Sequence, residues 1–69
     1  PAAHGERQVN FENEIFVATP TYRRETLRAG HRIDGPAIVD QLDATTVVFP
    51  GQHATVDRHG NLIIEETEA

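Results

Sequence analysis

Two histidines and an aspartate in the second half of the chain have the residue types of a metal site. His53 and Asp57 are four residues apart, so in a β-strand both side chains point to the same face as Thr55. Imidazole nitrogens and carboxylates are ordinary zinc ligands, and His59 follows two residues later. Alternating polar residues are, however, also typical of a solvated strand face, and His59 falls in a predicted turn. We therefore predict no metal-binding residues.

Thr45 and Thr46, close to Asp43, are the candidate nucleophiles. A catalytic threonine needs a general base within hydrogen-bonding reach, and no residue here has a spacing that provides one. Threonines at the start of a strand are explained by their β propensity alone. The other aspartates are expected at turns, where a carboxylate accepts hydrogen bonds from its own backbone: Asp34, Asp40 and Asp57, like Asp43. We predict no catalytic residue in this chain.

The glycine pairs and the arginines do not indicate a cofactor site. Gly35-Pro36 and Gly60-Asn61 do not open a helix, as a phosphate-binding loop requires. Three arginines lie close together in the sequence: Arg23, Arg24 and Arg28. We interpret them as a solvated face, with an anion site as the less favoured alternative. His4 and His31 are expected in loops. We predict no cofactor-binding residues and no cofactor in this chain itself.

The composition excludes several classes of protein. The chain has 69 residues, enough for one small domain whose own core is marginal. It has no cysteine, which excludes disulfides, thiolate nucleophiles and cysteine-ligated metals. It has no lysine, and its net charge of −5 argues against nucleic acid as a partner. No segment resembles a signal peptide or a membrane span, so we expect a soluble, cytoplasmic protein without membrane contact.

The elements that position these side chains in the first half are predicted from periodicity. Residues 1–6 are expected to be a flexible lead-in. Residues 7–17 alternate apolar and polar types, which predicts one long strand or two short strands broken near Asn13. Pro20 lacks an N–H and should end that strand or lie at a sheet edge. Tyr22–Gly30 is expected to form one helical turn or a 3₁₀ piece, with Gly30 as a left-handed cap.

In the second half, proline and glycine corners separate short strands. Gly35-Pro36 predicts a corner before residues 37–39, an apolar run expected to be covered on both faces. Residues 45–49 predict a further strand. It ends at Pro50-Gly51, a dipeptide typical of a type II turn, which here indicates a change of sheet more than a tight hairpin.

The last two predicted strands form the clearest local signal. Residues 52–57 and 62–64 flank a turn that begins at Asp57 and closes at Gly60, which predicts a hairpin with a bulge. Residues 66–69 are expected to be a disordered acidic tail. The fold class predicted is mainly β: a small single-domain β-sandwich or barrel-like sheet over residues 7–65, with one short helical turn.

An ordered set of residues resembles a known family. The set starts with Pro20, Tyr22, Arg24, Leu27 and Gly30, and continues with Ile33 and Gly35–Val39. Its second part is Thr45-Thr46, Val48, Pro50-Gly51, Val56-Asp57 and Gly60–Leu62. This pattern is similar to the C-terminal end of the A-type subunit of the hydantoinase/oxoprolinase family. That family includes N-methylhydantoinase A, 5-oxoprolinase and subunits of acetone and acetophenone carboxylases. The resemblance runs from about Arg7 to Glu65.

The resemblance implies a small β domain that closes a much longer, bacterial-type hydrolase or carboxylase chain. In that family the upstream part has an ATPase-like fold and uses ATP, with a divalent cation, to activate a cyclic amide or carbonyl substrate. The implied partners are those upstream domains and a B-type subunit. The matching positions are structural corners, so no catalytic role is carried over to them. Asp40-Gln41 and Phe49 depart from the family's usual residues.

Two interpretations therefore remain open on the sequence. The first is a non-catalytic structural and assembly domain of an ATP-dependent hydantoinase/oxoprolinase-type subunit. The second is a free-standing β module that binds a protein partner through an apolar sheet face, with Tyr22 and Phe49 as anchors. The absence of methionine and the opening Pro1-Ala2-Ala3 favour a piece of a longer polypeptide.

Overall fold

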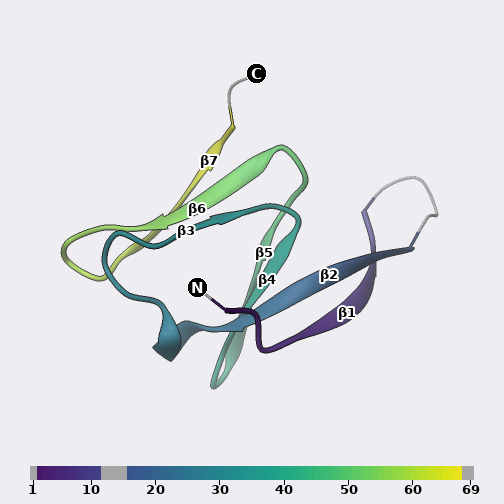
Figure 1. Cartoon of the computed structure of the whole chain (residues 1–69), viewed down its shortest axis with the longest axis horizontal. Coiled ribbons are helices and arrows are strands. Elements are labelled where there is room, and N and C mark those ends of the chain that lie inside the picture. Colours follow the sequence, from purple (N-terminus) through teal and green to yellow (C-terminus); the bar gives the residue numbers. More distant parts are fainter. Residues whose placement is uncertain (1, 12–15, 68–69) are drawn as a thin grey trace.

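The computed structural model describes residues 2–11 and 16–67, which form seven strands in two sheets (Figure 1). The strands are β1 (Gly5–Asn10), β2 (Phe16–Arg23), β3 (Arg32–Asp34), β4 (Ala37–Gln41), β5 (Ala44–Val48), β6 (Gln52–Val56) and β7 (Leu62–Glu66). The predicted mainly β fold with one short helical turn is confirmed, since the helical part of these residues is the 3₁₀ turn η1 (Arg24–Thr26). None of their helical segments has the length and apolar character needed to span a bilayer.

The first sheet has four strands in the order β1-β2-β4-β5. β1 and β2 are antiparallel, with Arg7 opposite Thr19. β2 and β4 are parallel over a short stretch, with Arg23 opposite Asp40. β4 and β5 are an antiparallel hairpin. The parallel pair explains the long connection between β2 and β4, because parallel neighbours need a crossover. That crossover contains η1 and β3.

The second sheet has three antiparallel strands in the order β3-β6-β7. The predicted hairpin between residues 52–57 and 62–64 is confirmed as β6 and β7. In its turn, the Gly60 N–H donates to the Asp57 carbonyl at 3.0 Å, and Gly60 has a φ of 83°. The left-handed residue expected at Gly60 is therefore present.

The core lies between the two sheets. Val39 and Val48 from the first sheet are completely buried, and Ile33, Ala54 and Val56 from the second sheet are nearly so. Leu27, which follows η1, joins the same cluster, and Tyr22 and Leu62 pack against it. Residues 37–39 are buried throughout, as predicted for a strand covered on both faces. The two sheets thus share one apolar core.

Two corners carry the chain from one sheet to the other, and they touch. Gly35-Pro36, a cis peptide, connects β3 of the second sheet to β4 of the first. Pro50-Gly51 connects β5 back to β6, with Gly51 at a φ of 87° and Gln52 N–H donating to the Phe49 carbonyl at 3.0 Å. The predicted change of sheet at Pro50-Gly51 is confirmed. Gly35 N–H donates to the Gln52 carbonyl at 2.8 Å and so joins the corners.

The prediction that Pro20 ends its strand is wrong, because β2 continues to Arg23. The alternative, a position at a sheet edge, holds only locally, because β2 as a whole lies between β1 and β4. The physical reason is that β4 pairs with β2 only from Thr21 onward, so no partner strand lies beside the proline on that side. On the unpaired side of a strand, a missing N–H costs no ladder hydrogen bond.

Three further expectations concern segment ends. Gly30 has the predicted positive φ, 89°, but lies beyond η1, and its N–H donates to the Val56 carbonyl at 2.9 Å. β1 begins at Gly5, inside the expected lead-in, and β7 includes Glu66, the first residue of the expected tail. The break near Asn13 and the end of the tail, Glu68 and Ala69, lie outside the described residues. The domain limits 7–65 stay a prediction.

Candidate functional site

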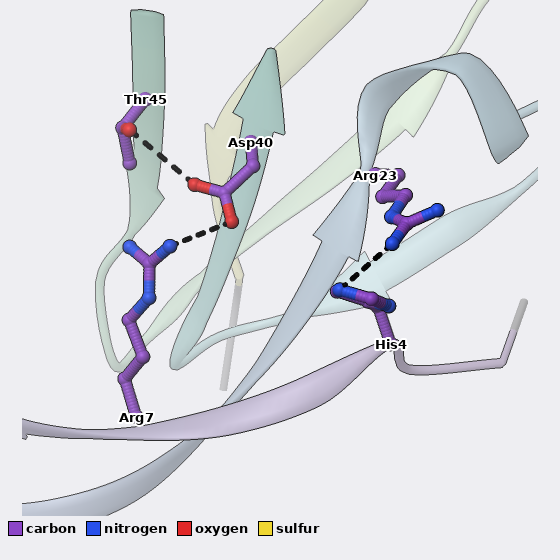
Figure 2. A network of polar contacts seen from close by, with 5 residues as sticks. All are labelled: His4, Arg7, Arg23, Asp40 and Thr45. Atoms are coloured by element: carbon purple, nitrogen blue, oxygen red, sulfur yellow. Dashed lines mark hydrogen bonds and ion pairs between the residues drawn. The ribbon is translucent and has the colours of Figure 1, made fainter. Parts of the chain in front are cut away.

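A line of polar contacts crosses the first sheet. Arg7 on β1 donates to the Asp40 carboxylate on β4 at 2.8 Å, and Thr45 on β5 donates to the other oxygen of Asp40 at 3.3 Å (Figure 2). Asp40 therefore binds residues from both sides of its strand. The hydroxyl of Thr45, a candidate nucleophile, contacts Asp40 and not the neighbouring Asp43. The contacts join residues of β1, β4 and β5, so this line is suited to holding strands together.

A second polar contact lies at the C-terminal end of β2. The Arg23 guanidinium contacts Nε2 of His4 at 3.2 Å, apart from the Arg7–Asp40 pair (Figure 2). Together with Ala2, Thr26 and His31, these residues line a cleft of about 430 Å³. Sequence spacing does not link Arg23 to the two histidines, because the three residues come from separate segments that only the folded chain brings together.

The candidate zinc ligands are not brought into one cluster. His53 on β6 contacts the Thr67 hydroxyl at 2.9 Å through Nδ1 and lies 4.0 Å from the Glu65 carboxylate through Nε2. Asp57 lies in the β6–β7 turn, where its carboxylate accepts hydrogen bonds from backbone N–H groups. Within residues 2–11 and 16–67, no three histidine or acidic side chains are grouped as a metal ion would require.

Asp57 organises the β6–β7 turn. Its Oδ1 accepts the Asn61 N–H at 2.8 Å and the His59 N–H at 2.9 Å, and its Oδ2 accepts the Asn61 side-chain amide at 3.3 Å. These donors, led by the Asn61 N–H and opposed by some desolvation, lower the pKa of Asp57 below its ordinary value of 3.8. The carboxylate therefore acts as a cap for the turn, as predicted for an aspartate at this position.

Several large apolar side chains are exposed to solvent. Leu42, at the tip of the β4–β5 hairpin, is fully exposed. The others are Phe16, Val17, Phe49, Ile63 and Ile64. Beside Leu42, a hollow of about 310 Å³ is lined by Leu27, Gln41 and Leu42 together with Arg24 and Glu25 of η1. Of the two proposed anchors of a binding module, Phe49 is exposed, whereas Tyr22 packs against the core.

The chain is similar to parts of several large enzymes. It is 48% identical over 54 residues to the acetophenone carboxylase gamma subunit of Aromatoleum aromaticum, covering 78% of this chain and 7% of that subunit. It is 40% identical over 47 residues to 5-oxoprolinase 1 of Arabidopsis thaliana, covering 68% of this chain and 4% of that protein.

A solved structure shows the same fold. The nucleotide-free structure of acetone carboxylase, from work on the mechanism of ATP-dependent acetone carboxylation, superimposes with a TM-score of 0.87 at 30% sequence identity. The match covers 96% of this chain and 9% of that one. The chain thus spans between 4 and 9% of the length of these relatives. Residues 1–67 match the family model of the hydantoinase/oxoprolinase C-terminal domain, and the chain belongs to that family.

Proposed function

We propose that this chain is a non-catalytic structural and assembly domain at the C-terminal end of an ATP-dependent hydantoinase/oxoprolinase-type enzyme subunit. The family membership and the small share of each relative support this proposal. The carboxylates with several hydrogen bonds have structural roles. Asp40 connects three strands, and Asp57 caps a turn.

The observation that carries the proposal is the exposed apolar surface. A domain of this size gains little stability from its own core, and burying exposed apolar side chains on more protein adds roughly 25 cal/mol per Å². Leu42 projects fully into solvent beside a hollow, and Ile63 and Ile64 are neighbours on an edge strand, β7, so both of its faces carry an apolar group. Such a surface fits the upstream domains of the same polypeptide.

The activity of the parent protein belongs to the same proposal. The solved relative comes from work on ATP-dependent acetone carboxylation, and the other relatives are named as a carboxylase subunit and an oxoprolinase. We propose that the parent acts in the cytoplasm on a cyclic amide or carbonyl substrate. It would use ATP and a divalent cation, held by residues outside this chain, and a B-type subunit as partner.

The test has two arms. The 69-residue chain is incubated with ATP and Mg²⁺, and no ADP is expected above the level of a heat-denatured sample. In the parent polypeptide, Ile63→Asp is expected to reduce the yield of assembled enzyme, whereas Arg58→Gln on the neighbouring turn is expected to leave it unchanged. Turnover per assembled molecule should be the same in both. A loss of turnover with normal assembly would show a role in the chemistry and would refute the proposal.

A further inference from the structure

We propose that the cleft lined by His4, Arg23, Thr26 and His31 binds an oxyanion, a carboxylate or a phosphate group. This site is separate from the exposed apolar side chains, and its existence does not depend on the assembly role. The cleft has a volume of about 430 Å³, within the range of small-ligand sites. Three of its lining side chains carry nitrogen donors, and they come from the segment before β1, the end of β2 and the loop before β3.

Hydrogen-bond partners determine which ring nitrogen of His4 and of His31 carries the proton. A guanidinium has only donors, so in the Arg23–His4 contact of 3.2 Å the Nε2 of His4 accepts. The neutral His4 ring therefore carries its proton on Nδ1. His31 accepts the Arg28 backbone N–H at its Nδ1, at 2.9 Å, so its proton lies on Nε2. Each ring thus holds an N–H donor that no acceptor in the described part of the chain engages.

The charge of Arg23 is not neutralised by the described part of the chain. Arg7 and Arg32 form ion pairs with Asp40 and Asp34, whereas Arg23, like Arg24, Arg28 and Arg58, pairs with none of the described carboxylates. Unlike Arg24 and Arg28, Arg23 also donates to no backbone carbonyl among the contacts of the described residues. Asp40 is the register neighbour of Arg23 on β4, but its two oxygens are occupied by Arg7 and Thr45. A positive group with free donors is therefore kept in a cleft of a chain whose net charge is −5.

The chemistry of these donors selects the ligand. Arginine and imidazole N–H groups together bind carboxylate or phosphate oxygens through charge-assisted hydrogen bonds. Thr26 supports the arrangement, because its hydroxyl donates to the Arg23 carbonyl at 2.7 Å and holds η1 against the end of β2. A cation or an apolar group would leave the guanidinium desolvated without a partner, which is unfavourable.

The experiment compares two arginines with the same charge. Arg58 also contacts a histidine, His59, at 3.5 Å, but on the exposed β6–β7 turn. The ¹⁵N-labelled chain is titrated with inorganic phosphate and with acetate at constant ionic strength, and the amide signals of Thr26 and His31 are followed by NMR. Saturable shifts are expected for the wild type and for Arg58→Gln. Arg23→Gln should weaken the apparent affinity by about tenfold or more, since a charge-assisted bond to the ligand is lost.

Non-saturating shifts, or equal weakening by Arg58→Gln and Arg23→Gln, would overturn the proposal. The source of the oxyanion is settled on crystals of the parent polypeptide soaked in selenate. Anomalous density between Arg23 and His31 identifies a free oxyanion, and an aspartate or glutamate of the parent lying there identifies an internal one. This second measurement also applies if the 69-residue chain does not give a dispersed spectrum. A cleft that is empty at saturating selenate, or covered by apolar groups, would refute the site.

Discussion

Arg7 and Asp40 are 33 residues apart in the sequence and form an ion pair of 2.8 Å, with strand β2 between them. The contact joins an edge strand, β1, to an interior strand that it does not pair with. Thr45 extends the same line to the other edge strand, β5. A single carboxylate on β4 thus connects three of the four strands of the sheet through side chains, in addition to the backbone ladders (Figure 2).

We predict a small, salt-sensitive coupling between these two residues. Both side chains are partly exposed, 52% for Arg7 and 26% for Asp40, and ion pairs of this kind contribute about 0.2 to 1 kcal/mol. A double-mutant cycle with Arg7→Ala and Asp40→Ala, measured by urea unfolding, isolates the pair from the Thr45 contact. The coupling should fall when NaCl is raised from low salt to about 1 M. A coupling well above about 1 kcal/mol that resists salt would contradict this prediction.

Gly35→Ala should destabilise the fold severely. A Cβ at Gly35 would lie 2.0 Å from the Phe49 carbonyl oxygen and 3.1 Å from the Gln52 carbonyl oxygen, and both are backbone atoms of the other corner. The two corners would have to separate, and the hydrogen bond from Gly35 to Gln52 would be lost. We expect a loss of about 3 kcal/mol or more, which in a domain of this size removes the unfolding transition altogether.

Gly51→Ala is the matched control for that substitution. Gly51 also has a special conformation, with a φ of 87°, but no atom lies within 4 Å of a Cβ placed there. Only the cost of a left-handed alanine remains, about 1 to 2 kcal/mol. Thermal unfolding followed by circular dichroism should therefore rank wild type above Gly51→Ala, and Gly51→Ala above Gly35→Ala. Equal losses in the two variants would show that contact between the corners is unimportant.

The features that sequence alone predicted correctly are local ones. Pro50-Gly51 and the Asp57–Gly60 turn are determined by residues within four positions of one another, through the φ values that proline and glycine adopt. The burial of residues 37–39 followed from an unbroken apolar run. These signals are properties of short segments, so they could be interpreted without the rest of the fold.

The features that were missed depend on long-range pairing. The parallel contact of β2 with β4 has no local signature, nor does its start at Thr21, which leaves Pro20 without a β4 partner. The contact of Arg7 with Asp40 and that of His4 with Arg23 likewise follow from strand order. The predicted alternation placed His53 and Asp57 on one face of a strand. In the structure, however, the Asp57 carboxylate accepts hydrogen bonds from backbone N–H groups of the turn. The candidate cleft could therefore not be predicted from spacing.

Leu42→Ser should distinguish a surface residue from a docking residue. Leu42 is completely exposed at the tip of the β4–β5 hairpin, so its removal should change the unfolding free energy of the 69-residue chain by no more than about 0.5 kcal/mol. In the parent polypeptide, the same change should lower the melting temperature if the side chain is buried there. Differential scanning calorimetry on both proteins makes the comparison. An unchanged parent would show that Leu42 is not part of the contact.

The turn at Asp57 gives a prediction about pH. The lowered pKa of Asp57 means that the folded state favours its ionised form more than the unfolded state does, where the pKa is near 3.8. Its contribution to stability is therefore fully present above the unfolded pKa. It is lost progressively as the pH falls through the lower pKa of the folded state.

Asp57→Ala tests whether the contribution of Asp57 to stability is lost as the pH falls. The variant loses the acceptor for the Asn61 and His59 N–H groups, so it should be less stable than the wild type at neutral pH. Because protonation removes the same advantage, the difference between the two proteins should shrink as the pH falls below the unfolded-state pKa of 3.8. Urea unfolding at a series of pH values measures this difference directly, with Asp43→Ala as a control for a general change of charge. A difference that is constant or grows toward low pH would show that the ionised carboxylate does not hold the turn.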